Sequence, residues 1–168
     1  MQSPLMKSRK IKLLGAAIAL WALGCAPLPA QPKPSRTPQE QAILKFVLDW
    51  WREGVVARHP EMVKKYFADN FIQHNPNLAG GTSAIEKMLS RRLPMEIQPT
   101  LPRSETPVFT VSQGELVTLV FEREAPDPQD PSKNYKYNSI DIFRVRNGKI
   151  VEHWDGSKKD PPPPQKKK

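Results

Sequence analysis

The chain has 168 residues, 19 of them proline, and a formal net charge of +9 at pH 7. Four of these charges lie in residues 7–12 and a net four more in residues 158–168, which leaves +1 on residues 31–157. The middle of the chain is nearly neutral, so its charge indicates no basic groove for nucleic acid, and we predict no nucleic-acid partner. A single cysteine excludes an intramolecular disulfide and a thiolate metal cluster.

The first part of the chain has the layout of an export signal. Basic residues within 7–12 precede the apolar run 13–24, which is too short to span a bilayer as a helix. Leu23-Gly24-Cys25 then resembles a bacterial lipobox, in which the cysteine is lipidated and begins the mature chain. Leu28-Pro29-Ala30 offers a competing cleavage site for soluble secretion. We therefore expect an exported cell-envelope lipoprotein, anchored to the membrane through Cys25, or otherwise a soluble secreted or periplasmic protein.

Composition divides the chain into four parts. We assign residues 1–25 to a signal peptide of lipoprotein type, residues 26–36 to a proline-rich linker and residues 158–168 to a disordered tail of prolines and lysines. Residues 37–157, about 120 in number, suit a single domain with one hydrophobic core.

Three helices are predicted in the first half of this domain. Thr37-Pro38-Gln39-Glu40 forms a capping box with proline in the first turn, which begins a helix over 37–54. A second helix is predicted for residues 60–67. The capping-box pattern Ser83-Ala84-Ile85-Glu86 begins a third helix, over 83–92.

Strands follow the helices. A short strand is predicted for residues 71–74, before Asn75-Pro76. The later strands are predicted at about 95–100, 107–113, 116–124, 135–146 and 149–157. Helices first and strands after favour an α+β fold, in which three N-terminal helices pack on one face of a curved antiparallel sheet. A curved sheet wrapped on the long first helix would enclose a pocket.

Asn147-Gly148 lies between two β-rich stretches and is a strong hairpin signal. A two-residue turn would place Phe143 opposite Glu152, which pairs a core residue with an acid. A three-residue loop with a left-handed Gly148 bulge would instead place Asp141 opposite His153. We expect this second register, in which Asp141 and His153 lie on the pocket face.

In the same register, the other face of the hairpin carries four large apolar side chains, Ile140, Ile142, Ile150 and Trp154. A monomer seldom leaves such a patch exposed, and an apolar face of this kind can pair with its own copy about a two-fold axis. We therefore expect a homodimer.

Two stretches resemble the SnoaL-like, polyketide cyclase-like branch of the nuclear transport factor two-like superfamily: residues 66–76 read YFADNFIQHNP, and residues 141–155 read DIFRVRNGKIVEHWD. The resemblance covers about residues 40–157. It implies a cone-shaped α+β fold with a deep pocket, often dimeric. In the cyclases of that branch, an aspartate acts as general acid and base in an intramolecular aldol condensation without a cofactor, and Asp141 matches it. The cyclases also carry a histidine on the preceding strand, whereas residues 116–121 contain none.

An aldol condensation needs a base that removes a proton next to a carbonyl and an acid that protonates the new alkoxide. Asp141 beside His153 could supply both groups, and His74 at the pocket edge could bind the carbonyl oxygen. We predict these three residues as catalytic. The alternative is that Asp141 is a buried structural acid, hydrogen-bonded to His153 or Tyr137.

Five aromatic residues are predicted to line the pocket: Trp50, Phe46, Tyr66, Phe121 and Tyr137. The three histidines show neither HxxxH nor HxH spacing, so we predict no metal site. Nothing resembles a phosphate-binding loop or a dinucleotide fingerprint, and we predict no cofactor.

The predicted function is that of an exported pocket protein for a small apolar molecule with a carbonyl or hydroxyl group. One hypothesis is a cofactor-independent enzyme of the aldol or isomerase type that uses Asp141. The other is a non-catalytic small-molecule-binding module of the cell envelope. A purely structural dimer would have a filled cavity, so an open cavity with Asp141 at its base would favour the first two hypotheses.

Overall fold

The computed structural model describes residues 36–160, and the predicted signal peptide, the lipidation site Cys25 and the end of the tail lie outside them. The described residues form α1 (Pro38–Trp50), η1 (Trp51–Val56), α2 (Met62–Tyr66), β1 (Phe67–Gln73), α3 (Thr82–Leu89), η2 (Arg103–Glu105), β2 (Phe109–Gln113), β3 (Leu116–Pro126), β4 (Asn134–Arg146) and β5 (Lys149–Asp155). Within this part of the chain, no helix is long and apolar enough to cross a membrane.

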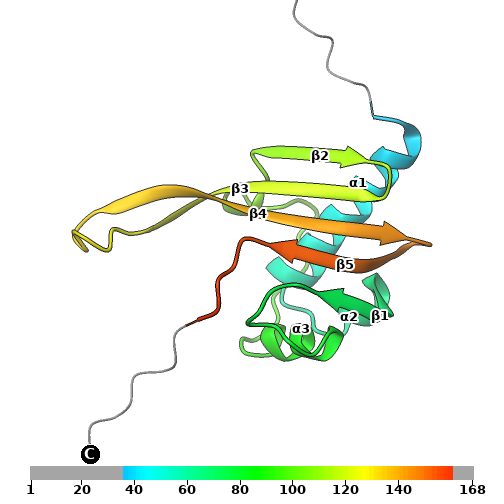
Figure 1. The fold of residues 1–168 in the computed structure, drawn as a ribbon, viewed down its shortest axis with the longest axis horizontal. Helices are drawn as coiled ribbons and strands as arrows, with labels where there is room; N and C mark the ends of the chain where they lie inside the picture. Colours follow the sequence, from blue (N-terminus) through cyan, green and yellow to red (C-terminus); the bar gives the residue numbers. More distant parts are fainter. Residues whose placement is uncertain (1–35, 161–168) are drawn as a thin grey trace, which may run out of the picture. The chain divides into compact units, whose positions relative to one another are not determined.

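The five strands form one sheet in the order β1-β5-β4-β3-β2 (Figure 1). Neighbouring strands from β2 to β5 pair antiparallel, whereas β1 pairs parallel with β5. The sheet is therefore mixed and not wholly antiparallel. α1 packs on one face, which we call the inner face, and the opposite one is the outer face. The predicted α+β class is confirmed.

The capping box predicted at the start of α1 is confirmed. The Thr37 hydroxyl accepts from the Glu40 backbone N–H at 3.2 Å, and the Glu40 carboxylate accepts from the Thr37 N–H at 2.8 Å. After Trp50 the helix continues through η1, a π-helical turn, beyond the predicted end at Gly54. Trp50 and Trp51 are both buried although they are adjacent. A Cβ on Gly54 would lie 2.0 Å from the Trp50 ring, so glycine allows this close packing.

The second and third helices are shorter than predicted. α2 ends at Tyr66 because Phe67 already begins strand β1. α3 begins after Gly81, whose φ of 65° lies in the left-handed region, and it has no side-chain cap. The predicted capping box is wrong, since the Ser83 hydroxyl donates to the Gly80 carbonyl at 2.9 Å. α3 also ends at Leu89, before the predicted limit.

The strand predicted for residues 95–100 is wrong. Pro94 and Pro99 lack the N–H group that a strand ladder requires, and the segment is irregular. The Met95 N–H instead donates to the Ala57 carbonyl at 2.8 Å, and the Met95 carbonyl lies 2.8 Å from the His59 ring. The segment is thus attached to the end of η1, not to the sheet.

The β4–β5 hairpin follows neither predicted register. Asn147-Gly148 forms a two-residue turn, with both residues in the left-handed region at φ 51° and 69°. A bulge follows, and beyond it Phe143 lies opposite His153 and Asp141 opposite Asp155. The prediction that Asp141 lies opposite His153 is therefore wrong, because the residue opposite Asp141 is two positions further along β5. Both side chains nevertheless lie on the inner face, as predicted.

The bulge explains why both predicted registers failed. Val145 pairs with Ile150, and Phe143 pairs with His153. Between these two pairs β4 advances by two residues and β5 by three, so β5 contains one extra residue. The extra residue keeps Ile150 and His153 on the inner face, where they are 0% and 8% exposed. Ile150 thus belongs to the core and not to the predicted outer patch.

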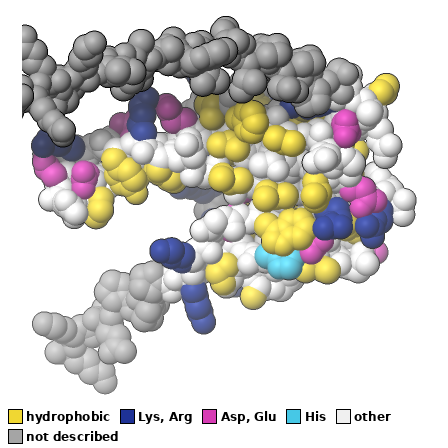
Figure 2. Space-filling model, turned by 45° about the horizontal axis from the view of Figure 1, so that its top comes forward, with side chains coloured by type: hydrophobic (Ala, Val, Ile, Leu, Met, Phe, Trp, Pro, Cys, Tyr) yellow, Lys and Arg dark blue, Asp and Glu magenta, His cyan; other side chains and the backbone are white. Residues whose placement is uncertain are grey.

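The outer face of the sheet remains apolar without Ile150. Two cross-strand rows cover it: Phe109, Val120 and Ile140 form one, and Val111, Thr118, Ile142 and Trp154 form the other. These side chains are exposed or half-buried. Figure 2 shows apolar side chains gathered on this side of the sheet, beside a histidine.

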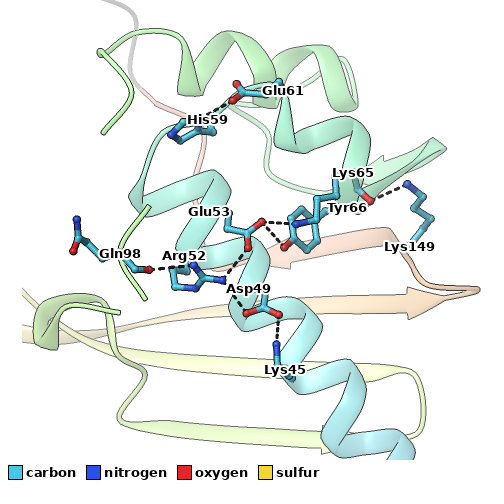
Figure 3. Close-up of polar contacts among 10 residues, drawn as sticks. All are labelled: Lys45, Asp49, Arg52, Glu53, His59, Glu61, Lys65, Tyr66, Gln98 and Lys149. Atoms are coloured by element: carbon cyan, nitrogen blue, oxygen red, sulfur yellow. Dashed lines mark hydrogen bonds and ion pairs between the residues drawn. The ribbon is translucent and has the colours of Figure 1, made fainter. Parts of the chain in front are cut away.

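A polar network joins the end of the first helix to α2 (Figure 3). The Glu53 carboxylate accepts from Lys65 Nζ at 2.6 Å and from the Tyr66 hydroxyl at 2.7 Å, and Arg52 donates to it at 2.8 Å. Burial alone would raise the pKa of Glu53, but these hydrogen bonds outweigh it and lower the pKa. Burial, helped by the hydrogen bond to Glu53, raises the pKa of Tyr66 to about 12.

Candidate functional site

A cavity of about 210 Å³ lies between the helices and the inner face of the sheet. One part of its lining is apolar: Trp50, Trp51, Val55, Phe67, Leu78, Ile85, Met88 and Phe143. The other part is polar: Gln73, Asn75, Asp141, His153 and Asp155. Pockets for drug-sized ligands measure roughly 300–1,000 Å³, so this cavity suits a smaller molecule.

The sheet brings the polar residues together from three separate segments. The parallel pairing of β1 with β5 places Gln73 beside His153. The antiparallel pairing of β4 with β5 places Asp141 beside Asp155. Side chains two residues apart on a strand share a face, so His153 and Asp155 both point inward. Asn75 is the second residue after the end of β1.

Hydrogen bonds fix the orientation of the His153 ring. The backbone N–H of Asn75 donates to Gln73 Oε1 at 3.0 Å, and since a backbone N–H can only donate, that side-chain atom is an oxygen. His153 Nδ1 lies 2.9 Å from the same oxygen and must therefore carry a hydrogen. The other ring nitrogen, Nε2, lies 3.2 Å from Asp141 Oδ1.

This orientation fixes what Asp141 and His153 can share. With Nδ1 protonated, Nε2 of a neutral ring has only a lone pair, and a carboxylate oxygen is also an acceptor. A hydrogen bond between the two atoms thus requires one proton, held either by His153 Nε2 or by Asp141. The side chains are 10% and 15% exposed, so few water molecules compete for that proton.

Asp155 is the third ionisable group of the cavity. Its Oδ2 accepts from the Asn75 amide at 2.6 Å, and its Oδ1 accepts from the Ser157 backbone N–H at 2.9 Å. Asp141, His153 and Asp155 each offer an atom that lies within 4.8 Å of the other two, which would allow them to hold a metal ion. The predicted absence of a metal stays a prediction.

His74 lies away from the cavity. Its side chain points to the outer face, because it follows the inward-facing Gln73 on the chain. There His74 Nε2 lies 2.8 Å from a Glu152 oxygen, and the ring stacks on Trp154 with the centroids 4.9 Å apart. The structure thus brings Asp141 and His153 together but separates His74 from them.

Of the five aromatic residues predicted for the pocket, Trp50 alone lines this cavity. Phe46 and Tyr66 pack on each other behind it, with ring centroids 5.0 Å apart. Phe121 is fully buried in the core, and Tyr137 is 43% exposed on β4.

Sequence reasoning did not identify Trp51, Gln73, Asn75 and Asp155 as site residues. Trp51 stacks on Phe121 with the ring centroids 4.6 Å apart and also lines the cavity. For Asp155 a signal existed, because it lies two positions after His153 on a strand and so shares its face. Gln73 and Asn75 gave no comparable signal, since their place depends on the parallel pairing of β1.

The family model described as "SnoaL-like domain" matches residues 47–153 of this chain. A search of curated protein sequences gave no match. Among solved structures, a candidate polyketide cyclase from Bacillus cereus ATCC 10987 is 18% identical, with a TM-score of 0.44, over 73% of this chain and 79% of that chain. A candidate SnoaL-like polyketide cyclase from Jannaschia sp. CCS1 is 14% identical, with a TM-score of 0.49, over 74% and 92% of the two chains. These sequence identities and TM-scores are too low to assign the activity of either protein to this chain.

Proposed function

This chain belongs to the SnoaL-like domain family, and we propose that its cavity performs acid/base catalysis without a cofactor. The substrate is a small, largely apolar carbonyl or hydroxyl compound, and the reaction is of the aldol or isomerase type. One observation carries the proposal: Asp141 Oδ1 and His153 Nε2 lie 3.2 Å apart at the polar end of an apolar cavity, within reach of a single shared proton.

The shared proton suits the chemistry of a carbonyl compound. With the proton on His153, the Asp141 carboxylate takes a proton from the carbon next to the carbonyl, and the electron pair of that C–H bond forms an enolate. The enolate oxygen accepts a hydrogen bond from His153 Nε2–H. In an aldol reaction the enolate carbon attacks a second carbonyl, and Asp141 returns its proton to the new alkoxide. In an isomerisation the proton returns to a different carbon.

A non-catalytic binding module of the cell envelope is the second candidate. The observation that favours it is the inner face of β3, where Val117, Leu119 and Phe121 are buried and apolar. This strand adds no acid or base to the cavity, so Asp141 and His153 would act without a third group from β3.

We also propose export and a homodimer. The lipobox-like stretch that ends at Cys25 supports a lipid anchor, and fatty-acid labelling in a bacterial host should tag the protein but not Cys25→Ser. An unlabelled mature chain that begins at Gln31 would show soluble secretion instead. The apolar rows of the outer face support the dimer, because two copies could cover them about a two-fold axis.

The catalytic proposal can be tested without knowing the natural substrate. Small cyclic and aryl ketones in deuterated water lose the NMR signal of the proton next to the carbonyl when an enzyme forms the enolate. The wild-type protein should accelerate this loss for at least one ketone. Asp141→Asn keeps the shape of the side chain and should slow the exchange by on the order of 100-fold or more.

A matched control separates catalysis from folding. Asp69 lies exposed on β1 and does not line the cavity, so Asp69→Asn should leave the exchange rate unchanged. The melting temperature of Asp141→Asn should fall by only a few degrees. Equal exchange with and without wild-type protein for every ketone would overturn the catalytic proposal. A ligand found by native mass spectrometry would then favour the binding module.

A further inference from the structure

Two aspartates face each other across β4 and β5 at the polar end of the cavity. Asp141 and Asp155 are a registered cross-strand pair on the inner face. Like charges directly opposite each other destabilise a sheet. Asp141 has His153 as a partner, whereas the hydrogen-bond donors to Asp155 are the Asn75 amide and the Ser157 backbone, which are neutral.

The charge of the cavity follows from these partners. If one proton is shared between Asp141 and His153, the pair is neutral overall wherever that proton lies. The carboxylate of Asp155 then leaves a net charge of −1. Among the described residues that line the cavity there is no lysine or arginine to balance it.

The rest of the lining accepts an organic cation better than an anion. Trp50, Phe67 and Phe143 supply aromatic rings, and the negative face of such a ring attracts a cation. A carboxylate or phosphate in the cavity would meet two aspartates and an apolar wall. An ammonium group would meet a carboxylate and aromatic rings.

We propose that the cavity selects a ligand with a protonated amino group, and that Asp155 is the residue that binds this group. This inference rests on the proposed function of the cavity and names its substrate class: a small apolar amine that also carries a carbonyl or hydroxyl group. The ammonium donates hydrogen bonds to Asp155, and the apolar part lies against Trp50 and Phe67. Asp141 and His153 stay free for proton transfer.

Three probes of nearly equal size test the charge preference. Benzylamine is cationic at pH 7, benzyl alcohol is neutral and benzoate is anionic, and calorimetry or NMR titration in a buffer with EDTA measures their binding. Benzylamine should bind at least tenfold more tightly than benzyl alcohol, and benzoate should not bind detectably. This series uses the wild-type chain alone, so it does not depend on the folding of a variant.

A substitution then tests the role of Asp155. Asp155→Asn keeps the shape of the side chain but removes its charge, and it should bring the affinities for benzylamine and benzyl alcohol within threefold of each other. Asp69→Asn, with its charge outside the cavity, should keep the full preference. An unchanged preference in Asp155→Asn would overturn the assignment of Asp155.

Two further outcomes would overturn the inference in a recognisable way. Equal binding of benzylamine and benzyl alcohol to the wild-type protein would show that charge does not select the ligand. Binding of Zn²⁺ in the absence of EDTA, lost in Asp155→Asn and without any binding of benzylamine, would make a metal the favoured cation. In either case, ketone exchange that depends on Asp141 would leave the proposed function standing. Conversely, preferred binding of benzylamine without any ketone exchange would contradict the proposed catalysis but leave the proposed amine selectivity standing.

Discussion

The two faces of the sheet are both rich in apolar side chains, yet they differ in where polar groups lie. On the inner face, Asp141, His153 and Asp155 gather at one end of a cavity that is lined elsewhere by aromatic and other apolar side chains. On the outer face, His74 and Glu152 lie beside Trp154 at the surface. A polar group among buried residues costs free energy unless it is paired, and the groups of the inner cluster are paired with one another and with Gln73, Asn75 and Ser157. The outer face, in contrast, calls for a partner, because its apolar rows are open.

Two histidines, one on each face, give the largest expected contrast. His153→Asn can keep the hydrogen bond to Gln73 but loses the nitrogen that faces Asp141. We expect ketone exchange to slow by on the order of 100-fold or more. His74→Asn should change the rate by less than twofold. The measurement is NMR-detected exchange on both purified variants, with circular dichroism to confirm that each is folded.

A large loss of exchange in His74→Asn, with His153→Asn unaffected, would reverse the assignment of the two faces. It would restore the predicted role of His74 and remove that of His153, which was predicted as catalytic beside it.

Gly54 contacts Trp50, which belongs to the aromatic wall of the cavity formed by Trp50, Trp51, Phe67 and Phe143, so a substitution of Gly54 should disturb this wall. Its Cβ would lie 2.0 Å from the Trp50 ring, so Gly54→Ala must displace that ring. Overpacking of this kind costs about 1–3 kcal/mol of unfolding free energy. Urea unfolding measures it, and Gly156→Ala is the matched control, since nothing lies within 4 Å of a Cβ there. Equal unfolding free energies of the two variants would mean that the Trp50 ring can move aside without loss of stability.

Trp154 tests the outer face. We expect Trp154→Glu to weaken the proposed homodimer by on the order of tenfold or more, because aromatic residues carry much of the free energy of such interfaces. Sedimentation velocity over a range of concentrations measures the effect. Lys87→Glu, which introduces the same side chain at an exposed position of α3 away from the outer face, is the control and should leave association unchanged. A wild-type chain that sediments as a monomer at micromolar concentration would show that the outer face has another use or none.

The sequence predicted the local structure better than the pairing of the strands. The capping box at Thr37 and the hairpin turn at Asn147-Gly148 depend on neighbours in the chain. The capping box was found as predicted, and Asn147-Gly148 does connect β4 to β5, although through a two-residue turn and not the expected three-residue loop. The bulge in β5, after Ile150, could not be read from the sequence, because it depends on which residues of β5 are buried in the core. Ile150 had to be buried together with His153, and only an extra residue between them allows this.

The same distinction holds for the candidate site. Asp141 and His153 could be predicted to lie close together because they belong to one hairpin, and the expected three-residue loop places them on one face, as the observed bulge also does. Gln73 and Asn75 could not, since only the parallel pairing of β1 with β5 brings them to the hairpin. Trp51 was missed because the helical spacing of the apolar residues selects Trp50, whereas the π-helical turn that begins at Trp51 buries this next residue as well.

The smallest expected effect concerns the polar network that supports the inner face from the helix side. The pKa of Glu53 is lowered, since hydrogen bonds from Lys65 and Tyr66 outweigh its burial. A group whose folded-state pKa is lowered stabilises the protein above its unfolded-state pKa, and this stabilisation is lost as the pH falls through the folded-state pKa. Glu53→Gln should therefore be less stable than wild type at pH 7, by about 1 kcal/mol. The difference should shrink as the pH falls below the ordinary value of 4.5.

Urea unfolding of wild type and Glu53→Gln at pH 7, 5 and 3.5 measures this difference directly. Other carboxylates with lowered pKa values, such as Glu115, titrate in both proteins and cancel in the comparison. Glu115→Gln is a useful control, because its partner Arg146 is exposed and such surface pairs contribute little. If the stability difference for Glu53→Gln stayed constant over this pH range, the carboxylate charge would not be what holds the first helix to α2. The aromatic wall of the cavity would then depend on packing alone.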